Sequence, residues 1–231
     1  MYVYGKNVIK ELINSKEKIN KAFIYENFTD KEIIDSLNKK NINIEYLKKY
    51  EMDKKVDGNH QGIIVSIDDY VYADIDELIV NDNPLLVILD HIEDPHNFGA
   101  IIRTCEAAGV DGIIIPKNRS VAVNSTVMKV STGALQNIKV SMVTNIKSTI
   151  EYLKEKGFWV VGTDMDGEDY TKIDYTGKTV IIIGNEGSGL SRIVRESCDF
   201  IASIKMNGKV NSLNASVATG IIVFEAIKKR G

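Results

Sequence analysis

Three separated segments hold the residues whose types and spacing could do chemistry. The first, residues 90–104, reads DHIEDPHNFGAIIRT; Asn97 is predicted to cap a helix there, and Gly99 leaves room for a ligand or another backbone. Arg103 lies off the apolar stripe of that helix. Its guanidinium could pair with Glu106 three residues on and remain in solvent, or it could bind a phosphate or a ribose. The segment alone leaves both interpretations open.

The second segment, residues 181–191, reads IIIGNEGSGLS and follows an apolar run. Its three glycines within six residues allow positive φ angles and close approach of backbone to a ligand. The spacing is that of a phosphate loop, but Leu190 stands where lysine is required, and Arg192 breaks the dinucleotide-binding fingerprint. A tight turn without a ligand, with Glu186 in solvent, therefore remains an alternative to a binding loop.

The third segment, residues 203–220, reads SIKMNGKVNSLNASVATG and leads into a strongly apolar helix. The backbone amides of residues 212–216, at the start of this helix, could donate hydrogen bonds to a ligand. The helix is predicted to carry one apolar face, formed by Leu213, Val217, Ile221, Phe224 and Ile227 and widened by Val223 and Ala226. Such a face is typical of a hydrophobic core or of a dimer contact.

The elements that must position these segments form a repeating pattern after Pro84. Apolar, strand-like runs alternate with helical stretches, and several runs are apolar throughout, as in parallel strands covered on both faces. The runs are residues 85–90, 112–116, 139–143, 159–164, 179–184 and 200–205. This alternation predicts an α/β fold with a doubly wound, mostly parallel sheet. In such sheets ligands bind beyond the carboxyl ends of the strands, where the first two segments begin.

The first 68 residues are predicted to form a separate small α/β domain. Helical patterns at residues 8–15 and 31–40 alternate there with short strand-like runs, and Asp30 is suited to cap the second helix. The strand-like runs are residues 22–25, 42–47 and 62–67. We expect an acidic linker at residues 69–83 and one larger domain at residues 84–231.

Composition narrows the class of protein but does not identify a partner. The net charge is −3, and residues 1–70 hold 12 lysines, no arginine and 12 acidic residues, so bulk attraction to nucleic acid is excluded. No apolar run approaches the ~20 residues that span a bilayer, and the amino terminus does not resemble a signal peptide. Cys105 and Cys198 form no metal-ligand or disulfide pattern. We expect a cytoplasmic protein without a membrane anchor or a metal.

Taken together and in this order, the three segments resemble one family. D-x₄-P-x-N-x-G-A-x₂-R-T, then G-x-E-G-x-G, then S-L-N-x-S-V-A-x-G is similar to the three-motif signature of the SpoU methyltransferases, the TrmH family of the SPOUT superfamily. The resemblance covers residues 84–231. Residues 3–13 and NHQGIIV at 59–65 also resemble the family's ribosomal-protein-like, amino-terminal RNA-binding domain. This arrangement is most similar to the branch that methylates a guanosine ribose in 23S ribosomal RNA.

The resemblance implies a deep trefoil knot formed by residues 184–189, residues 204–211 and the terminal helix. It also implies that S-adenosylmethionine binds in the knot, largely through backbone groups. The implied cofactor-binding residues are Thr163, Gly184, Ile204, Met206, Ser212 and Leu213, with Gly133 and Leu135 nearby.

Arg103 matches the family's catalytic arginine, and Asn97, Glu186 and Asn214 match positions expected to orient it, the loops or the substrate. Because a guanidinium stays protonated at neutral pH, two roles remain open for Arg103, the general base or a phosphate-positioning cation. The resemblance further implies a homodimer in which each active site is completed across the interface. A ribose methyltransferase acting on tRNA, or a non-catalytic RNA-binding protein with the same fold, are the alternatives.

Overall fold

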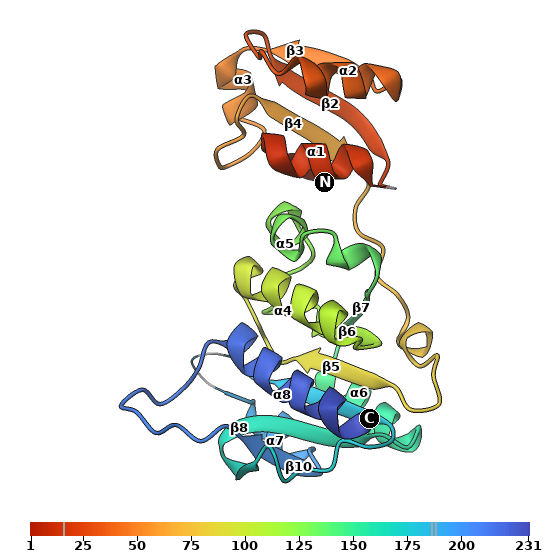
Figure 1. Cartoon of the computed structure of the whole chain (residues 1–231), viewed down its shortest axis with the longest axis vertical. Helices are drawn as coiled ribbons and strands as arrows, with labels where there is room; N and C mark the ends of the chain where they lie inside the picture. The colour runs from red at the N-terminus through yellow and green to blue at the C-terminus, as the bar shows by residue number, and fades with distance from the viewer. Residues whose placement is uncertain (16, 186, 188) are drawn as a thin grey trace. The chain divides into compact units, whose positions relative to one another are not determined.

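The computed structural model describes residues 1–15, 17–185, 187 and 189–231, and the chain divides into two compact units, Met1–Val71 and Tyr72–Gly231. Each unit has its own sheet (Figure 1). In the described parts of the chain, no helix is long and apolar enough to cross a membrane.

The first unit is a four-stranded sheet with three helices. The strands lie in the order β1 (Tyr2–Tyr4), β4 (Ile63–Ile67), β2 (Ile19–Tyr25) and β3 (Ile44–Leu47). Strand β4 is antiparallel to β1 and β2, whereas β3 is parallel to β2. Helices α1 (Lys6–Asn14), α2 (Lys31–Lys39) and α3 (Lys49–Asp53) complete the unit.

The faces of this sheet are covered by different helices. Helices α1 and α2 contact each other and bury their apolar residues. Met52 of α3 packs with Phe23 and Ile64, which alternate along their strands with residues of the other face. The Asp30 carboxylate accepts a hydrogen bond from the amide of Ile33 at 3.4 Å, so Asp30 caps α2 as the sequence predicts. Strand β1 and helix α3, each five residues or shorter, were not predicted.

The second unit contains a six-stranded sheet in which every pair of neighbouring strands is parallel. The strand order is β10 (Phe200–Ser203), β8 (Trp159–Asp169), β9 (Thr179–Ile183), β5 (Leu85–Leu89), β6 (Gly112–Pro116) and β7 (Lys139–Val143). The predicted parallel α/β sheet is confirmed.

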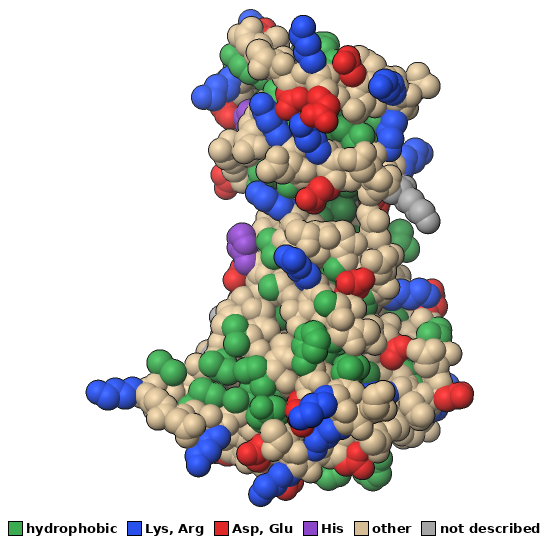
Figure 2. Space-filling view, viewed as in Figure 1, with side chains coloured by type: hydrophobic (Ala, Val, Ile, Leu, Met, Phe, Trp, Pro, Cys, Tyr) green, Lys and Arg blue, Asp and Glu red, His purple; other side chains and the backbone are tan. Residues whose placement is uncertain are grey.

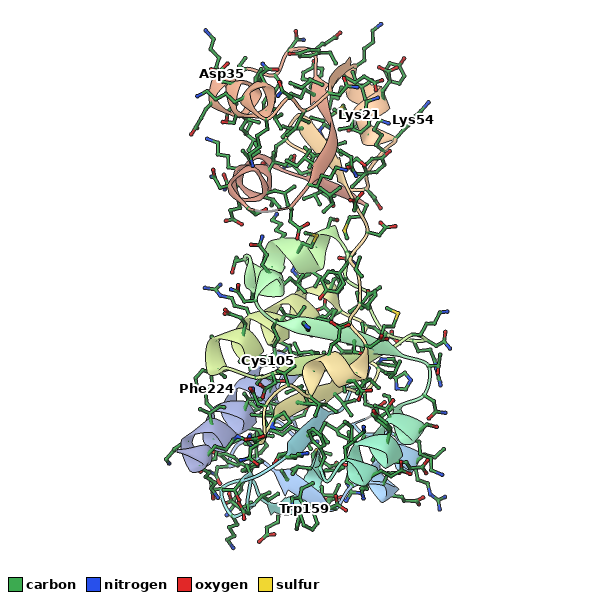
Figure 3. The ribbon with its side chains drawn as sticks, turned by 90° about the vertical axis from the view of Figure 1, so that its right-hand side faces the viewer. Lys21, Asp35, Lys54, Cys105, Trp159 and Phe224 are labelled. Carbon is green, nitrogen blue, oxygen red and sulfur yellow. The ribbon has the colours of Figure 1, made fainter. Side chains whose placement is uncertain are left out.

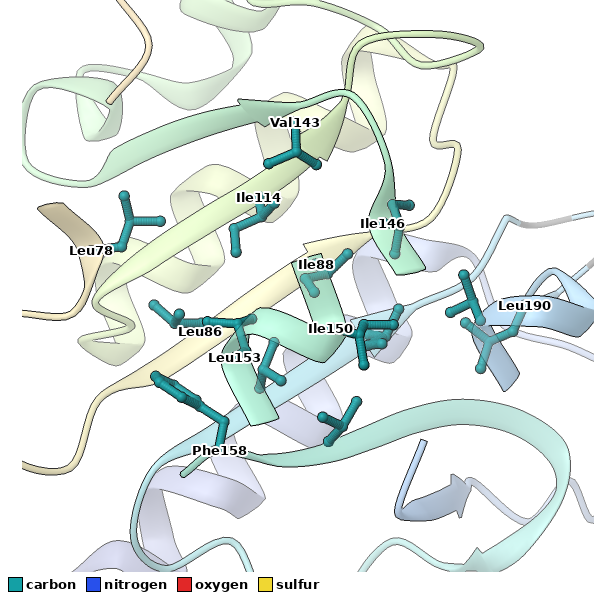
Figure 4. Packing of buried hydrophobic residues seen from close by; sticks show 14 residues of the cluster. Leu78, Leu86, Ile88, Ile114, Val143, Ile146, Ile150, Leu153, Phe158 and Leu190 are labelled. Atoms are coloured by element: carbon teal, nitrogen blue, oxygen red, sulfur yellow. The ribbon is translucent and has the colours of Figure 1, made fainter. Parts of the chain in front are cut away.

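Helices lie on both faces of this sheet. On one face, Ile150 and Leu153 of α6 (Ile146–Glu155) and Val194 of α7 (Arg192–Glu196) pack into a buried cluster with alternate residues of the central strands (Figure 4). On the other, α4 (Pro95–Ala108) packs against α8 (Ala215–Arg230) and α5 (Ser125–Ser131). The continuous apolar runs of the strands are therefore buried from two sides.

The segment that we expected to be a linker at residues 69–83 belongs largely to the second unit. Ala73 forms a β-bridge with Ser141, and Leu78, at the end of the 3₁₀ helix η1 (Ile75–Leu78), is fully buried. Leu78 packs so closely that a Cβ at Gly112 would lie 2.3 Å from its Cγ. We predicted a linker because the segment is acidic in composition, although its few apolar residues, such as Leu78, pack against the second unit.

Helix α8 buries a face that overlaps the predicted one only at Val223 and Ala226. Ala215, Thr219, Ile222, Val223 and Ala226 are buried, whereas Val217 and Phe224 are 49% and 51% exposed. The helix is apolar on most of its circumference, so periodicity alone could not select the face. Packing against α4 decides which face is buried, and Thr104 of α4 lies 3.6 Å from where a Cβ of Gly220 would be, an ordinary contact distance.

Candidate active site

A cavity of about 390 Å³ lies beyond the carboxyl ends of β9 and β10, beside β8 and the start of α8. Six of the residues predicted to bind a cofactor line it: Thr163, Gly184, Ile204, Met206, Ser212 and Leu213. They come from three stretches of the chain that the fold brings together. Several other lining residues were not predicted as ligands, among them Asp164, Asn185, Ala218 and Ile222.

Gly133 and Leu135 do not line this cavity. They lie at the 3₁₀ helix η2 (Ala134–Gln136), which contacts α4 and β7. The expectation that these two residues lie near a cofactor came only from the family resemblance. Within one chain, the fold does not bring them to the cavity.

The loop after β9 turns so tightly that a side chain at Gly184 is excluded. A Cβ there would lie 2.5 Å from the carbonyl carbon of Gly189 and 2.7 Å from the amide nitrogen of Leu190. The loop closes through two backbone hydrogen bonds between Asn185 and Gly189, at 2.9 and 3.0 Å, and Gly189 has a φ of +65°. Glu186, predicted to be functional, lies outside the described residues.

A buried carboxylate anchors this loop to the neighbouring strand. Asp90, at the end of β5, is 1% exposed; its Oδ2 accepts a hydrogen bond from the amide of Ser191 at 2.9 Å, and its Oδ1 contacts Nδ1 of His91. The Asn185 side chain in turn donates to the carbonyl of His91 at 2.8 Å. The first two motifs are therefore joined directly. Asp90 was expected at the end of a strand and as the first residue of the first motif, but its hydrogen bond to the second motif was not predicted.

Asn97 does not cap α4, contrary to our prediction. The Asp94 carboxylate accepts a hydrogen bond from the amide of His96 at 2.9 Å, and Pro95 is the first helical residue, an arrangement that proline's fixed φ favours. Asn97 lies in the first turn, almost fully buried, and its Oδ1 accepts a hydrogen bond from Nδ2 of Asn214 at 2.9 Å. The first and third motifs therefore meet through these two amides.

Arg103 is exposed on α4 and does not line the cavity. Glu106, the partner considered from the sequence, instead accepts a hydrogen bond from Nδ2 of Asn137 at 3.0 Å. Among the residues that the structure describes, none forms an ion pair or a hydrogen bond with Arg103. Its guanidinium is therefore presented to solvent rather than to the interior of the chain.

Among the described residues that line the cavity, Asp164 carries the charged side chain. Its Oδ1 accepts a hydrogen bond from the amide of Met165 at 2.7 Å, and its Oδ2 forms an ion pair with Nη1 of Arg195 on α7. The other arm of that guanidinium donates to the carbonyl of Asp166 at 3.2 Å. Nearby, the Thr163 hydroxyl donates to the carbonyl of Ile182 at 2.9 Å.

Among the described residues, neither of the two cysteine thiols is a reactive nucleophile, and no cluster of metal ligands is found. Burial raises the pKa of the Cys198 thiol to about 11, and it raises that of the fully buried Cys105 further. Neither thiol is ionised at neutral pH, so neither is an activated nucleophile. Within the described ranges, no group of three or more His, Cys, Asp or Glu side chains could hold a metal ion.

Two family sequence models match the chain, one for each unit. Residues 84–224 match the SpoU rRNA methylase family, and residues 2–73 match the RNA 2′-O ribose methyltransferase substrate-binding domain. The chain belongs to the SpoU/TrmH family of S-adenosylmethionine-dependent RNA methyltransferases. The three motifs of this SpoU methyltransferase all lie within the first match.

Individual relatives agree with this assignment over almost the full chain. The TrmH family protein YacO of Bacillus subtilis, named as a tRNA/rRNA methyltransferase, is 43% identical over 238 residues, which cover 99% of this chain and 96% of YacO.

Two solved structures are similar throughout. The SpoU methyltransferase AviRb of Streptomyces viridochromogenes in complex with AdoMet has a TM-score of 0.79 at 24% identity, covering 99% of this chain and 90% of AviRb; at that identity it supports the fold alone. An AdoMet-bound rRNA methyltransferase of Sinorhizobium meliloti has a TM-score of 0.76 at 25% identity, covering 98% of this chain and 86% of that one.

Proposed function

We propose that this SpoU methyltransferase transfers a methyl group from S-adenosylmethionine to the 2′-hydroxyl of a guanosine ribose in large-subunit ribosomal RNA. The observation that carries the proposal is the cavity, in which residues of the second and third motifs line one site. The match of residues 2–73 to a substrate-binding domain favours ribosomal RNA, because the related tRNA guanosine branch usually lacks that domain.

The cavity residues suit this cofactor. Gly184 lets its loop close tightly at the cavity wall, and Ile204, Met206 and Leu213 offer apolar surface and main-chain groups to a nucleoside. When bound, S-adenosylmethionine would supply a methyl carbon activated by its sulfonium. We also propose that the chain is knotted here. In support, α7 lies on one face of the sheet and α8 on the other, so residues 204–214 must cross between the faces beside the cavity.

The reaction requires that the ribose hydroxyl lose its proton as the new oxygen–carbon bond forms and the carbon–sulfur bond breaks. A protonated guanidinium is a poor proton acceptor. We therefore assign Arg103 to binding an RNA phosphate and stabilising developing charge, while phosphate or solvent takes the proton. Asn97 and Asn214 are proposed to position the first and third motifs through the hydrogen bond between them. Glu186 is proposed to orient the loop after β9.

We propose that the enzyme is a homodimer. Arg103 is exposed and outside the cavity, so one chain does not bring its proposed catalytic cation to its own cofactor site. Hydrophobic side chains gather on the surface over α8 (Figure 2), and Phe224 projects outward from that helix (Figure 3). Pairing two copies through this face would bury it and could bring Arg103 of the partner subunit to the site.

In the first unit, lysines and aromatic rings gather on the sheet face that carries α3. The Lys55 ammonium lies 4.1 Å from the ring centroid of Phe23 and 5.6 Å from that of Tyr2, and Lys54 lies 5.6 Å from that of Tyr50. Lys21 also lies over Phe23 but pairs with Glu45 at 2.7 Å. We propose that this lysine–aromatic face, formed by Tyr2, Lys21, Tyr50, Lys54 and Lys55 around the buried ring of Phe23, contacts RNA phosphates and bases.

The experiment that tests the target is a map of 2′-O-methyl positions in total RNA from a strain lacking the gene. Loss of one guanosine methylation in large-subunit ribosomal RNA, restored by complementation, is the expected result. Loss in tRNA alone would identify the tRNA alternative. Because the proposed substrate is RNA of the cell interior, we place the enzyme in the cytoplasm.

A non-catalytic RNA-binding protein with this fold is the rival from another class. Isothermal titration of the full chain with S-adenosylmethionine separates the two. Binding of one cofactor per chain is expected of the enzyme, and no binding would favour the rival.

A further inference from the structure

Asp164 is unusual among the residues of the cavity. Of the lining residues that the structure describes, it alone carries a charged side chain; the others present backbone, apolar groups, amides or hydroxyls. Its side chain is 20% exposed, so the carboxylate is largely withdrawn from bulk water. A negative charge in such a place must affect the binding of a charged ligand.

The carboxylate of Asp164 is held in place from two sides. The amide of Met165 donates to its Oδ1 at 2.7 Å, and Arg195 pairs with its Oδ2. Both oxygens lie 3.9 Å from where a Cβ of Gly189 would be, which places the carboxylate beside the glycine loop. Arg195 is itself fixed by its bond to the carbonyl of Asp166. Arg195 therefore cancels part of the field of Asp164 without being a lining residue.

The methyl donor and its demethylated product differ in charge. S-Adenosylmethionine carries a sulfonium cation, whereas S-adenosylhomocysteine has a neutral thioether; both share the same adenosine and the same amino-acid group. A carboxylate at the cavity therefore favours the donor over the product. A hydrogen-bonding role toward the shared groups would affect both equally.

We infer that Asp164 is a specificity-determining residue, which makes this site prefer the sulfonium donor and release the neutral product, and that Arg195 sets the strength of this preference. The inference rests on the proposed binding of S-adenosylmethionine in this cavity. One partly screened unit charge at several ångströms corresponds to a preference on the order of 3- to 30-fold.

The test is isothermal titration of the full-length protein with each ligand, for the wild type, Asp164→Asn and Arg195→Gln. Asp164→Asn, which keeps the shape of the side chain, should weaken donor binding by about 3- to 30-fold and change product binding by less than about twofold. Arg195→Gln should shift the ratio of the two affinities in the opposite direction, toward the donor.

Arg192→Gln is the matched control. Arg192 is on the same helix, pairs with Glu196 and is 88% exposed, so its loss should leave the ratio unchanged. If Asp164→Asn leaves the ratio of the donor and product affinities unchanged, for example by weakening both equally, the inference is overturned while the proposed function stays intact. If Asp164→Asn does not fold, an unchanged ratio in Arg195→Gln overturns it. Failure of the wild type to bind the donor at all would instead reject the proposed function.

Discussion

The side-chain amide of Asn214 donates a hydrogen bond from Nδ2 to Oδ1 of Asn97 across 2.9 Å, joining residues 117 positions apart in the chain. The same Asn214 caps α8, because its Oδ1 accepts a hydrogen bond from the amide of Ser216 at 2.9 Å. One side chain therefore fixes the start of α8 and ties it to the first turn of α4. These two helices carry the first and third motifs.

Replacing Asn214 by alanine should lower the free energy of unfolding by about 1–2 kcal/mol, because both the helix cap and the hydrogen bond to Asn97 disappear. In a double-mutant cycle, Asn97→Ala and Asn214→Ala should couple by about 0.5–1.5 kcal/mol, since they break the same bond. Urea unfolding of the four proteins measures both quantities. Strictly additive effects would show that this bond contributes nothing to stability.

Gly184→Ala should disrupt the loop after β9, because the added Cβ would lie 2.5 Å from backbone atoms that cannot move away independently. We expect loss of S-adenosylmethionine binding and a lower melting temperature. Gly208→Ala is the matched control, since a Cβ there meets nothing within 4 Å. Calorimetric titration and thermal unfolding report the two effects, and a Gly184→Ala protein with wild-type affinity would refute the tight-loop geometry.

Cys198 should make stability depend on alkaline pH. Burial raises the pKa of its thiol to about 11, whereas a thiol in the unfolded chain ionises near pH ~8.5. As the pH rises, the unfolded state therefore releases this proton first. The stabilisation of the folded state by the protonated thiol is complete below about pH 8.5 and is lost as the pH rises toward 11. Chemical denaturation should show a steeper decline for the wild type than for Cys198→Ala over this window. Parallel curves would contradict the assignment.

The proposed lysine–aromatic face predicts a salt-dependent decrease in RNA affinity. Lys54→Ala with Lys55→Ala should weaken binding to large-subunit ribosomal RNA and reduce the slope of log K against log salt by about 0.7–0.9 for each phosphate that is no longer neutralised. Lys39→Ala, an exposed lysine of α2, is the control. Filter binding at several salt concentrations measures the slope. Equal effects of the two changes would reject this face as the RNA-binding surface.

Strand positions could be predicted from the sequence because the parallel strands are buried on both faces. The run at residues 179–184, for example, corresponds to β9 within one residue. Strand order could not be predicted, since nothing local shows that β9 lies between β8 and β5. The family resemblance named six residues that line the cavity. It included Asp90 as a motif position but not Asp164, and the contacts of neither could be predicted, because they are hydrogen bonds with residues 101 and 31 positions away.

Two predictions were wrong for reasons that lie in the local sequence, the cap of α4 and the buried face of α8. Both Asp94 and Asn97 are residue types suited to capping a helix, and the proline at position 95 decides between them. The apolar face of α8 was partly misassigned because Val217 and Phe224 are as hydrophobic as the residues that are buried. A helix that is apolar on most sides gives no periodic signal for which face meets the core.

The most direct measurement is single-turnover methyl transfer from labelled S-adenosylmethionine to large-subunit ribosomal RNA, with the product nucleosides identified by mass spectrometry. The wild type should yield 2′-O-methylguanosine. Arg103→Ala should bind the cofactor normally and lose on the order of 10²–10⁴ in rate, as expected when charge stabilisation is removed. Methylation of a base, or an Arg103→Ala enzyme that transfers at the wild-type rate, would contradict the account.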